Sequence, residues 1–166
     1  MFGVNGAGVE QAVSTYVKLM RAYKSVTGRV ETLLAVDGLT LTQLGVLEAV
    51  LHKGPMTHRE LGKKVLTSAG NMTDVVDKLE ARGLVRRLRG EVDRRQVRVE
   101  LTDVGRTLIE TLFPRHAGDI ARAMAGLGSD ELAQLGALLR KLAIAAAQEG
   151  ADPDLAVSDD PPNLTA

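Results

Sequence analysis

Six arginines are concentrated in one short stretch near the middle of the chain, between Arg86 and Arg98. A guanidinium group is planar, permanently charged and rich in N–H donors, so it binds phosphate and carboxylate oxygens. At the tip of a β-hairpin, an arginine can also enter the minor groove of DNA, whose narrow walls deepen the negative potential. Arg94 and Arg95 are the candidates for this contact, and the carboxylate of Asp93 can hold one of them in position.

The arginine-rich stretch is predicted to form a β-hairpin. Its strands are expected at 84–89 and 96–101, and the second strand alternates polar residues with Val97, Val99 and Leu101. Alternation of this kind is typical of a strand that has one buried face. The hairpin therefore presents its arginines to a partner, and the alternative is an exposed amphipathic hairpin without one.

Two helices are predicted before the hairpin. The first spans about 57–65 and opens with a capping box, in which Thr57 and Glu60 satisfy each other's backbone N–H groups. The second spans about 68–82 and ends before Gly83, a residue suited to a left-handed helix end. A helix, a turn, a second helix and a basic hairpin in this order predict a winged helix-turn-helix.

The second of these helices has an apolar side and a small, polar side. The apolar residues are spaced to bury one stripe, Met72, Val75, Val76 and Leu79. The candidates for DNA contact are the polar residues Thr67, Ser68, Asn71, Thr73, Asp74 and Lys78. Asn suits an adenine edge, Ser and Thr reach bases or phosphates, Lys neutralises a phosphate, and Asp suits only a donor such as the cytosine amine. The alternative is the solvated face of a core helix.

Charge is segregated along the chain. The whole sequence has 21 basic and 21 acidic residues, so the global balance indicates no partner. From His52 to Glu100 there are 12 basic and 7 acidic residues, net +5, and the remainder has 9 and 14, net −5. A basic centre between acidic ends favours a DNA-contacting module carried by a scaffold, with binding that weakens as salt rises.

The rest of the chain is predicted to be one mainly helical domain. With 45% hydrophobic and 2% aromatic residues among 166, its core must be aliphatic. We expect a winged core at about 39–101 and scaffold helices at about 10–36 and 102–148. The Gly-rich residues 1–9 are expected to be flexible, and the acidic, proline-containing tail 149–166 is expected to be disordered.

The scaffold helices carry more apolar surface than a winged core of this size can cover. In the last helix, leucines recur at intervals of three and four residues, at Leu132, Leu135, Leu139 and Leu142. A twofold homodimer would bury this surface and read a pseudo-palindromic operator, with half-sites about 34 Å apart. The alternative is a monomer whose terminal helices fold back on the winged core.

Other chemistry has few candidates. The chain has no cysteine, which excludes disulfides, thiol redox switches and sulfur-based zinc sites. Glu48 and His52 could share a metal with His58 or His116, but a pair at this spacing is more often an ion pair, so we expect no metal, no cofactor and no catalytic residue. No leader or apolar run of membrane-spanning length is present, so we expect a cytoplasmic, nucleoid-associated protein that binds no membrane.

Four runs of residues carry a family resemblance. They are Leu39-Thr-Leu-Thr-Gln-Leu-Gly-Val-Leu-Glu-Ala, the run from Val65 to Arg87, Asp93-Arg-Arg, and Leu101-Thr-Asp-Val-Gly-Arg. Together they resemble the MarR family of bacterial transcription regulators over about Val13 to Leu142. Asp74 departs from the pattern, because many members have a basic or neutral residue there.

The resemblance implies the following assignments. The recognition helix 68–82 would enter the major groove and the wing 89–95 the minor groove, in a dimer formed by the first and last two helices. A small aromatic or anionic effector would bind non-covalently between the scaffold and the winged core, and the candidate contacts are Tyr16, Arg21, Tyr23, His52 and Arg59. The expected function is a sequence-specific repressor of a nearby operon, released by its ligand. The alternative is a winged-helix module that binds protein partners without DNA sequence specificity.

Overall fold

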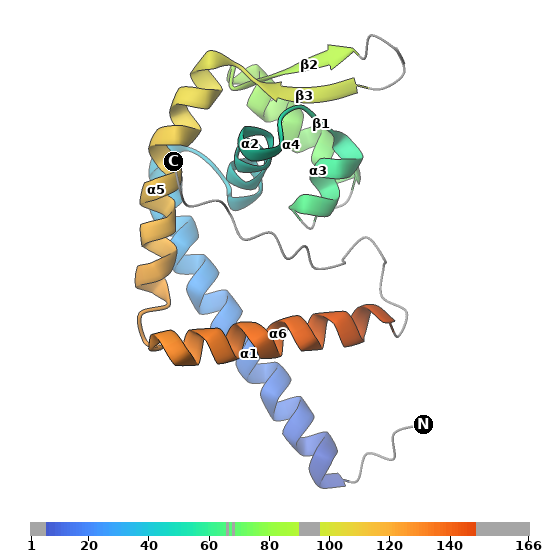
Figure 1. The fold of residues 1–166 in the computed structure, drawn as a ribbon, viewed down its shortest axis with the longest axis vertical. Helices are drawn as coiled ribbons and strands as arrows, with labels where there is room; N and C mark the ends of the chain where they lie inside the picture. Colours follow the sequence, from blue (N-terminus) through green and yellow to red (C-terminus); the bar gives the residue numbers. More distant parts are fainter. Residues whose placement is uncertain (1–5, 66, 68, 90–96, 149–166) are drawn as a thin grey trace.

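The computed structural model describes residues 6–65, 67, 69–89 and 97–148. In chain order the elements are α1 (Gly6–Leu34), the short 3-10 helix η1 (Ala35–Asp37), α2 (Leu41–Lys53), β1 (Met56–Thr57), α3 (His58–Lys64), α4 (Ala69–Ala81), β2 (Val85–Arg89), β3 (Val97–Leu101), α5 (Asp103–Ala123) and α6 (Ser129–Gln148). Figure 1 shows the winged core at one end of the molecule, with α1 projecting away from it. The expected fold class, mainly helical with an antiparallel wing and outer helices, is confirmed.

The wing is part of a three-stranded antiparallel sheet with the strand order β1-β3-β2. In β3, Val99 faces Arg87 of β2 on one side and Met56 of β1 on the other. The sequence analysis did not predict β1, because two residues are too few for an alternating pattern. This short strand ties the hairpin to the residue that caps α3.

An aliphatic core holds α2, α3, α4, the sheet and α5 together. Its fully buried side chains include Leu44, Leu47, Leu61, Met72, Leu79 and Ile109. The predicted apolar stripe of α4, Met72, Val75, Val76 and Leu79, is buried as expected. Because this stripe packs inward, the opposite face of α4 is directed to solvent.

Local capping signals in the sequence set the helix ends of the winged core. The predicted capping box of α3 is present, since the backbone N–H of Glu60 donates to the hydroxyl of Thr57 at 3.3 Å. A second capping box begins α2, where the backbone N–H of Gln43 donates to the hydroxyl of Thr40 at 3.2 Å. The hydrogen bonds that Thr57 donates to the Glu60 carboxylate hold the pKa of that group below its ordinary value. Gly83, with φ at 68°, takes the left-handed conformation predicted after α4.

The scaffold helices differ in detail from the sequence-based expectation. Residues 6–9, expected to be flexible, belong to α1, and Ala7 and Val9 are compatible with a helix. The helix α6 begins at Ser129, and the backbone N–H of Gly128 before it donates to the Glu131 carboxylate at 2.8 Å. The acidic tail 149–166 lies outside the described residues.

A polar corner connects the end of α4 to the scaffold. Arg82 donates to the backbone oxygens of Gly38 at 2.6 Å and of Asp37 at 3.2 Å. The Asp37 side chain forms an ion pair with Arg115 of α5. The position of α4 is therefore linked through η1 to α5, which packs along α1.

Acid should weaken the fold through His116 of α5. This side chain is buried, and its burial lowers its pKa below the ordinary value of 6.5, although Asp119 acts in the opposite direction. The unfolded chain then binds more protons than the folded one at about pH 6, so the free energy of unfolding should fall as pH drops through 6.5. Urea unfolding at a series of pH values should show this fall. In the variant His116→Gln, the free energy of unfolding should change less steeply with pH. An unchanged slope in that variant would remove His116 as the cause.

Candidate nucleic-acid interface

The turn between α3 and α4 fixes where α4 begins. Gly62 of α3 is buried, and its backbone oxygen accepts a hydrogen bond from the N–H of Thr67 at 3.0 Å. A Cβ atom at Gly62 would lie 3.0 Å from the backbone oxygen of Thr67, so the two segments meet without room for a larger residue. The turn is therefore tight, as the helix-turn-helix pattern requires.

The predicted DNA-contact residues gather on the outer face of α4. Asn71, Thr73, Asp74 and Lys78 are exposed there, and Thr67 is half-buried at its start. The amide nitrogen of Asn71 donates to the hydroxyl of Thr67 at 2.6 Å, which orients the amide. Ser68, the remaining candidate on this element, lies outside the described residues. The face is small and polar, as the sequence predicted.

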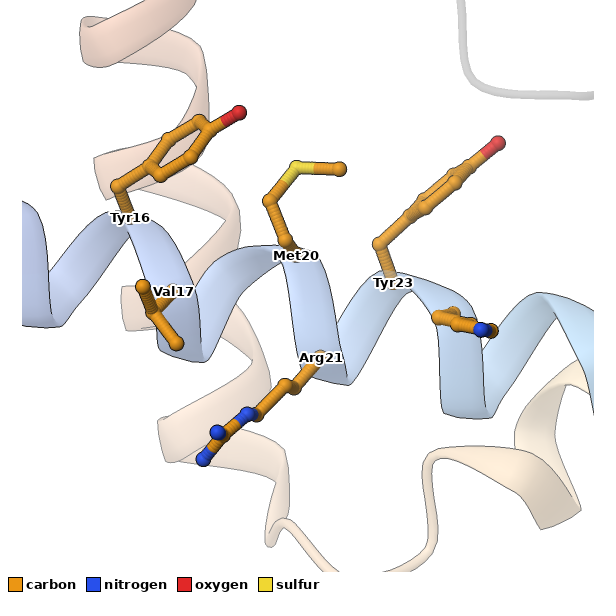
Figure 2. A pocket seen from close by; sticks show the side chains of 6 residues that line it. Tyr16, Val17, Met20, Arg21 and Tyr23 are labelled. Atoms are coloured by element: carbon orange, nitrogen blue, oxygen red, sulfur yellow. The ribbon is translucent and has the colours of Figure 1, made fainter.

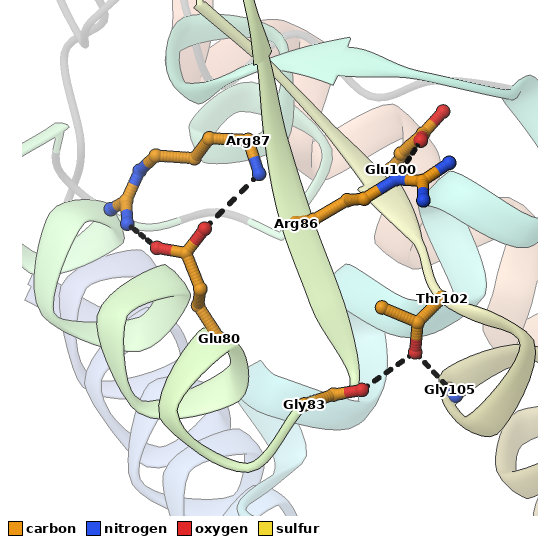
Figure 3. Close-up of polar contacts among 7 residues, drawn as sticks. All are labelled: Glu80, Gly83, Arg86, Arg87, Glu100, Thr102 and Gly105. Atoms are coloured by element: carbon orange, nitrogen blue, oxygen red, sulfur yellow. Dashed lines mark hydrogen bonds and ion pairs between the residues drawn. The ribbon is translucent and has the colours of Figure 1, made fainter.

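Three arginines of the hairpin, Arg86, Arg87 and Arg98, make internal contacts. Arg86 pairs with Glu100 on the neighbouring strand, and Arg98 donates to the backbone oxygen of Pro55 at 3.0 Å. Arg87 reaches back to α4, where it binds Asp77 and Glu80, and Figure 3 shows the contact with Glu80. Burial lowers the pKa of Arg87, but these hydrogen bonds outweigh it and the net shift is upward.

The hairpin tip is not described. Arg94 and Arg95, the predicted minor-groove contacts, lie outside the described residues. The strands β2 and β3 lead directly to this tip, because Arg89 pairs with Val97 at the last described rung of the ladder.

His58, at the start of α3, was not singled out as an interface residue from the sequence. Its Nε2 atom is buried and has no hydrogen-bond partner within the described residues. Burial, then the charge of Arg87, lowers the pKa of His58, whereas Asp77 and Glu80 act to raise it. His58 is thus the neutral member of a cluster that joins α3, α4 and β2.

Three predicted ligand contacts come together on α1. Tyr16, Arg21 and Tyr23 line an open hollow of about 380 Å³, whose other lining residues are Val17, Met20 and Lys24. Figure 2 shows Tyr16, Met20 and Tyr23 projecting to one side of the helix and Arg21 to the other. Since one helix supplies every lining residue, another surface is needed to enclose a ligand here.

The other two predicted ligand contacts lie elsewhere. His52 of α2 packs edge-on against Phe113 of α5, with ring centroids 5.5 Å apart. Arg59 is exposed in the first turn of α3. Glu48, one turn before His52, is half-buried, and burial raises the pKa of its carboxyl above the ordinary value while His52 and Lys64 act to lower it. These residues form no common site with Tyr16.

Within the described part of the chain, no group of three or more His, Asp or Glu side chains is placed to hold a metal ion. None of the described helices is by itself long and apolar enough to cross a membrane. The structural features that remain are the polar face of α4, the hairpin and the apolar scaffold helices.

Comparison with known proteins gives consistent matches. A model of the MarR family matches residues 39–97. The uncharacterized HTH-type transcriptional regulator YkoM of Bacillus subtilis is 38% identical over 140 residues, which cover 84% of this chain and 91% of that protein.

Two solved structures are similar throughout the described fold. A mutant MarR of E. coli in complex with operator DNA has a TM-score of 0.73 at 26% identity, covering 80% of this chain and 95% of that one. BpsR of Bordetella bronchiseptica, whose DNA binding is regulated by 6-hydroxynicotinic acid, has a TM-score of 0.69 at 27% identity, covering 86% of this chain and 95% of that one.

Proposed function

Since this chain belongs to the MarR family and is a DNA-binding transcription regulator, we propose that it works as a homodimer that represses a nearby operon and is released by a small ligand. The observation that carries the proposal is the exposed polar face of α4 beside a basic hairpin, on a scaffold that leaves apolar helices uncovered. In this proposal α4 is the recognition helix and lies in the major groove.

The contacts of the recognition helix follow from its outer face. Asn71 reads a base edge, and its hydrogen bond to Thr67 supports this role by orienting the amide in advance. Ser68 and Thr73 contact bases or phosphates, and Lys78 neutralises a phosphate. Asp74 accepts a hydrogen bond from a donor such as the cytosine amine, because cytosine itself presents a donor and no acceptor in the major groove.

Homodimerisation is proposed from the outer helices. Every described side chain of α6 up to residue 146 is exposed or half-buried in a single chain, although the helix is rich in leucine. Large apolar residues are also exposed along α1, namely Val9, Val13, Tyr16, Val17, Met20 and Tyr23. Apolar surface of this extent is unfavourable in water. A second copy of the chain would cover it and bring two recognition helices onto one operator.

A ligand site is proposed on the scaffold at the hollow of α1. Tyr16 and Tyr23 offer aromatic surface on one side of the helix, whereas Arg21 projects from the other side, so the hollow suits a small aromatic effector. The regulation of BpsR by 6-hydroxynicotinic acid, a small aromatic compound, supports this choice. Such a ligand weakens DNA binding only as far as it prefers the dimer geometry that cannot bind DNA. In this proposal, His52 and Arg59 contact the ligand only after the geometry of the dimer has changed.

The experiment that tests the proposal is selection of bound sequences from a random duplex pool with the purified protein. We expect an imperfect palindrome with half-sites about one helical turn apart, and an affinity for the selected duplex that falls steeply with salt. Enrichment of no sequence would contradict the proposal and favour the alternative of a protein-binding module.

Removing the two arginines of the wing tip should weaken DNA binding. Arg94→Ala/Arg95→Ala is expected to lower the affinity for the selected duplex by about tenfold or more, because the minor-groove contacts are lost. Fluorescence anisotropy would measure this loss. The control Arg106→Ala/Lys141→Ala removes the same charge from α5 and α6 and should bind nearly as well as the unchanged protein. Equal affinities for the two variants would remove the wing tip from the interface.

A further inference from the structure

The proposed recognition helix carries more negative than positive charge. Between residues 69 and 81 there are three carboxylates, Asp74, Asp77 and Glu80, and one ammonium group, that of Lys78. Carboxylates close to a phosphate backbone are repelled, and DNA binding depends on the positive charge that faces the phosphates. A helix of this composition needs a compensating cation if it is to lie in the major groove.

Arg87 supplies a cation at the required place. Its guanidinium group donates to Oδ1 of Asp77 at 2.5 Å and also to Oε2 of Glu80. Both carboxylates come from α4, while the arginine comes from the first strand of the wing. The side chain of Arg87 is 26% exposed, against 57% for Asp77 and 38% for Glu80. The arginine is therefore more enclosed than the two carboxylates that it binds.

Glu80 also connects the helix to the wing. Its Oε1 atom accepts the backbone N–H of Arg87 at 3.1 Å, while Oε2 accepts the guanidinium group, as Figure 3 shows. One carboxylate thus holds both the main chain and the side chain of the same residue. This double contact fixes the position of β2, and with it the position of the wing, relative to α4.

Two other charged residues near this cluster, Arg86 and Asp74, do not take part in it. Arg86 lies on the opposite side of β2 and pairs with Glu100, so it does not face α4 (Figure 3). No hydrogen bond or ion pair within the described residues engages the carboxylate of Asp74. Of the three carboxylates of α4, the two nearest the wing share one guanidinium group, and the third has no such contact among the described residues.

We infer that Arg87 is a positioning residue for DNA binding, which offsets part of the negative charge of Asp77 and Glu80 and holds the wing against the recognition helix without contacting DNA itself. The inference rests on the proposed roles of α4 and the hairpin. A positioning role for Arg87 can be distinguished from direct contact with DNA, because removing the two carboxylates should make a positioning arginine dispensable.

The test compares variants of the full chain on a labelled mixed-sequence duplex at low salt, by fluorescence anisotropy. Arg87→Gln should bind roughly tenfold more weakly, because two carboxylates then act on the phosphates. The triple variant Arg87→Gln/Asp77→Asn/Glu80→Gln should recover to within about threefold of the unchanged protein, since the two carboxylates that Arg87 offsets are then gone as well. Arg86→Gln, which removes the same charge from the neighbouring residue, should cost no more than about threefold.

Two outcomes would overturn the inference. If the triple variant binds as weakly as Arg87→Gln, Arg87 contacts DNA directly. If Arg86→Gln loses as much as Arg87→Gln, only the net charge of the wing matters. Should Arg87→Gln melt at a lower temperature, Asp77→Asn/Glu80→Gln decides the question: binding at least as tight as that of the unchanged protein supports the inference, and weaker binding contradicts it. Binding to a mixed-sequence duplex can be measured without knowing the operator. A result that contradicts the role of Arg87 is therefore distinguishable from a sequence selection that finds no operator.

Discussion

Gly105→Ala should destabilise the protein by more than about 3 kcal/mol, because the added Cβ atom has no space and the atoms that it meets belong to the backbone. A Cβ at this position would lie 1.8 Å from the backbone oxygen of Leu84 and 2.8 Å from its carbonyl carbon. Leu84 is itself buried in the core. A backbone segment enclosed in this way cannot move aside as a flexible side chain could.

The local hydrogen bonds explain why the first turn of α5 comes so close to Leu84. The hydroxyl of Thr102 donates to the backbone oxygen of Gly83 at 2.6 Å and accepts the N–H of Gly105 at 3.0 Å (Figure 3). The backbone N–H of Thr102 donates to Leu84 at 3.1 Å. These bonds draw the start of α5 onto the end of the helix-turn-helix, which leaves room for glycine alone.

A second glycine of the same helix provides the matched control for Gly105→Ala. At Gly118 an added Cβ would make only an ordinary contact, 3.5 Å from a nitrogen of the Arg122 side chain. Gly118→Ala should therefore stabilise the protein by about 0.5–1 kcal/mol, the usual gain of alanine over glycine in a helix. Urea unfolding followed by circular dichroism measures both variants. Equal midpoints would show that α5 does not approach Leu84 as closely as described.

Leu139→Asp/Leu142→Asp should convert the proposed dimer into a folded monomer and reduce operator affinity by about a hundredfold or more. Both side chains belong to the predicted leucine stripe of α6 and are 39% and 54% exposed in the single chain. Aspartate at these positions leaves the fold of one chain intact but cannot be buried against a second copy. A monomer engages one half-site only, so it loses the gain in effective concentration that links two half-sites.

Light scattering and anisotropy on the selected duplex would test the dimer prediction together. Gln134→Asp is the control, because it adds a carboxylate to an exposed polar position of the same helix outside the leucine stripe. It should remain dimeric and bind as the unchanged protein does. If the double variant is still a dimer, the interface lies elsewhere. If it is a monomer with full operator affinity, DNA binding does not need two chains.

Polar contacts connect the scaffold helices, where the effector is proposed to bind, to the recognition helix α4. Arg82 at the end of α4 is held by the backbone of Asp37 and Gly38, and the Asp37 carboxylate is held by Arg115 of α5. A ligand on α1 acts on the same scaffold pair, because α1 packs along α5. Movement between the scaffold helices can therefore change the position of the recognition helix. A ligand that binds one arrangement of these helices more tightly than the other would shift the protein toward that arrangement.

Features determined by residues close in sequence could be predicted correctly. The capping box at Thr57 joins residues three positions apart, and the left-handed Gly83 lies two residues after the end of α4. The buried stripe of α4 follows from helical periodicity alone. Such signals need no knowledge of the rest of the fold, since the interacting groups are neighbours in any helical chain.

The site could be predicted in part for the same reason. Helical spacing placed Asn71, Asp74 and Lys78 on one outer face, and the structure exposes them there. The hairpin arginines could be counted from the sequence but not assigned. Which of them face a partner and which are held internally depends on the strand register and on what lies beside each strand.

Amino-acid sequence by itself determined the helices, their caps, the charge of the hairpin and the family of this protein, because each rests on local pattern. Only the tertiary structure decided that Arg87 binds two carboxylates of α4, that Arg82 is held by Gly38 from 44 residues away, and that Gly105 meets Leu84. The physical reason is distance along the chain: these groups are brought together by packing of the common core, and no short-range spacing specifies which partner each one meets.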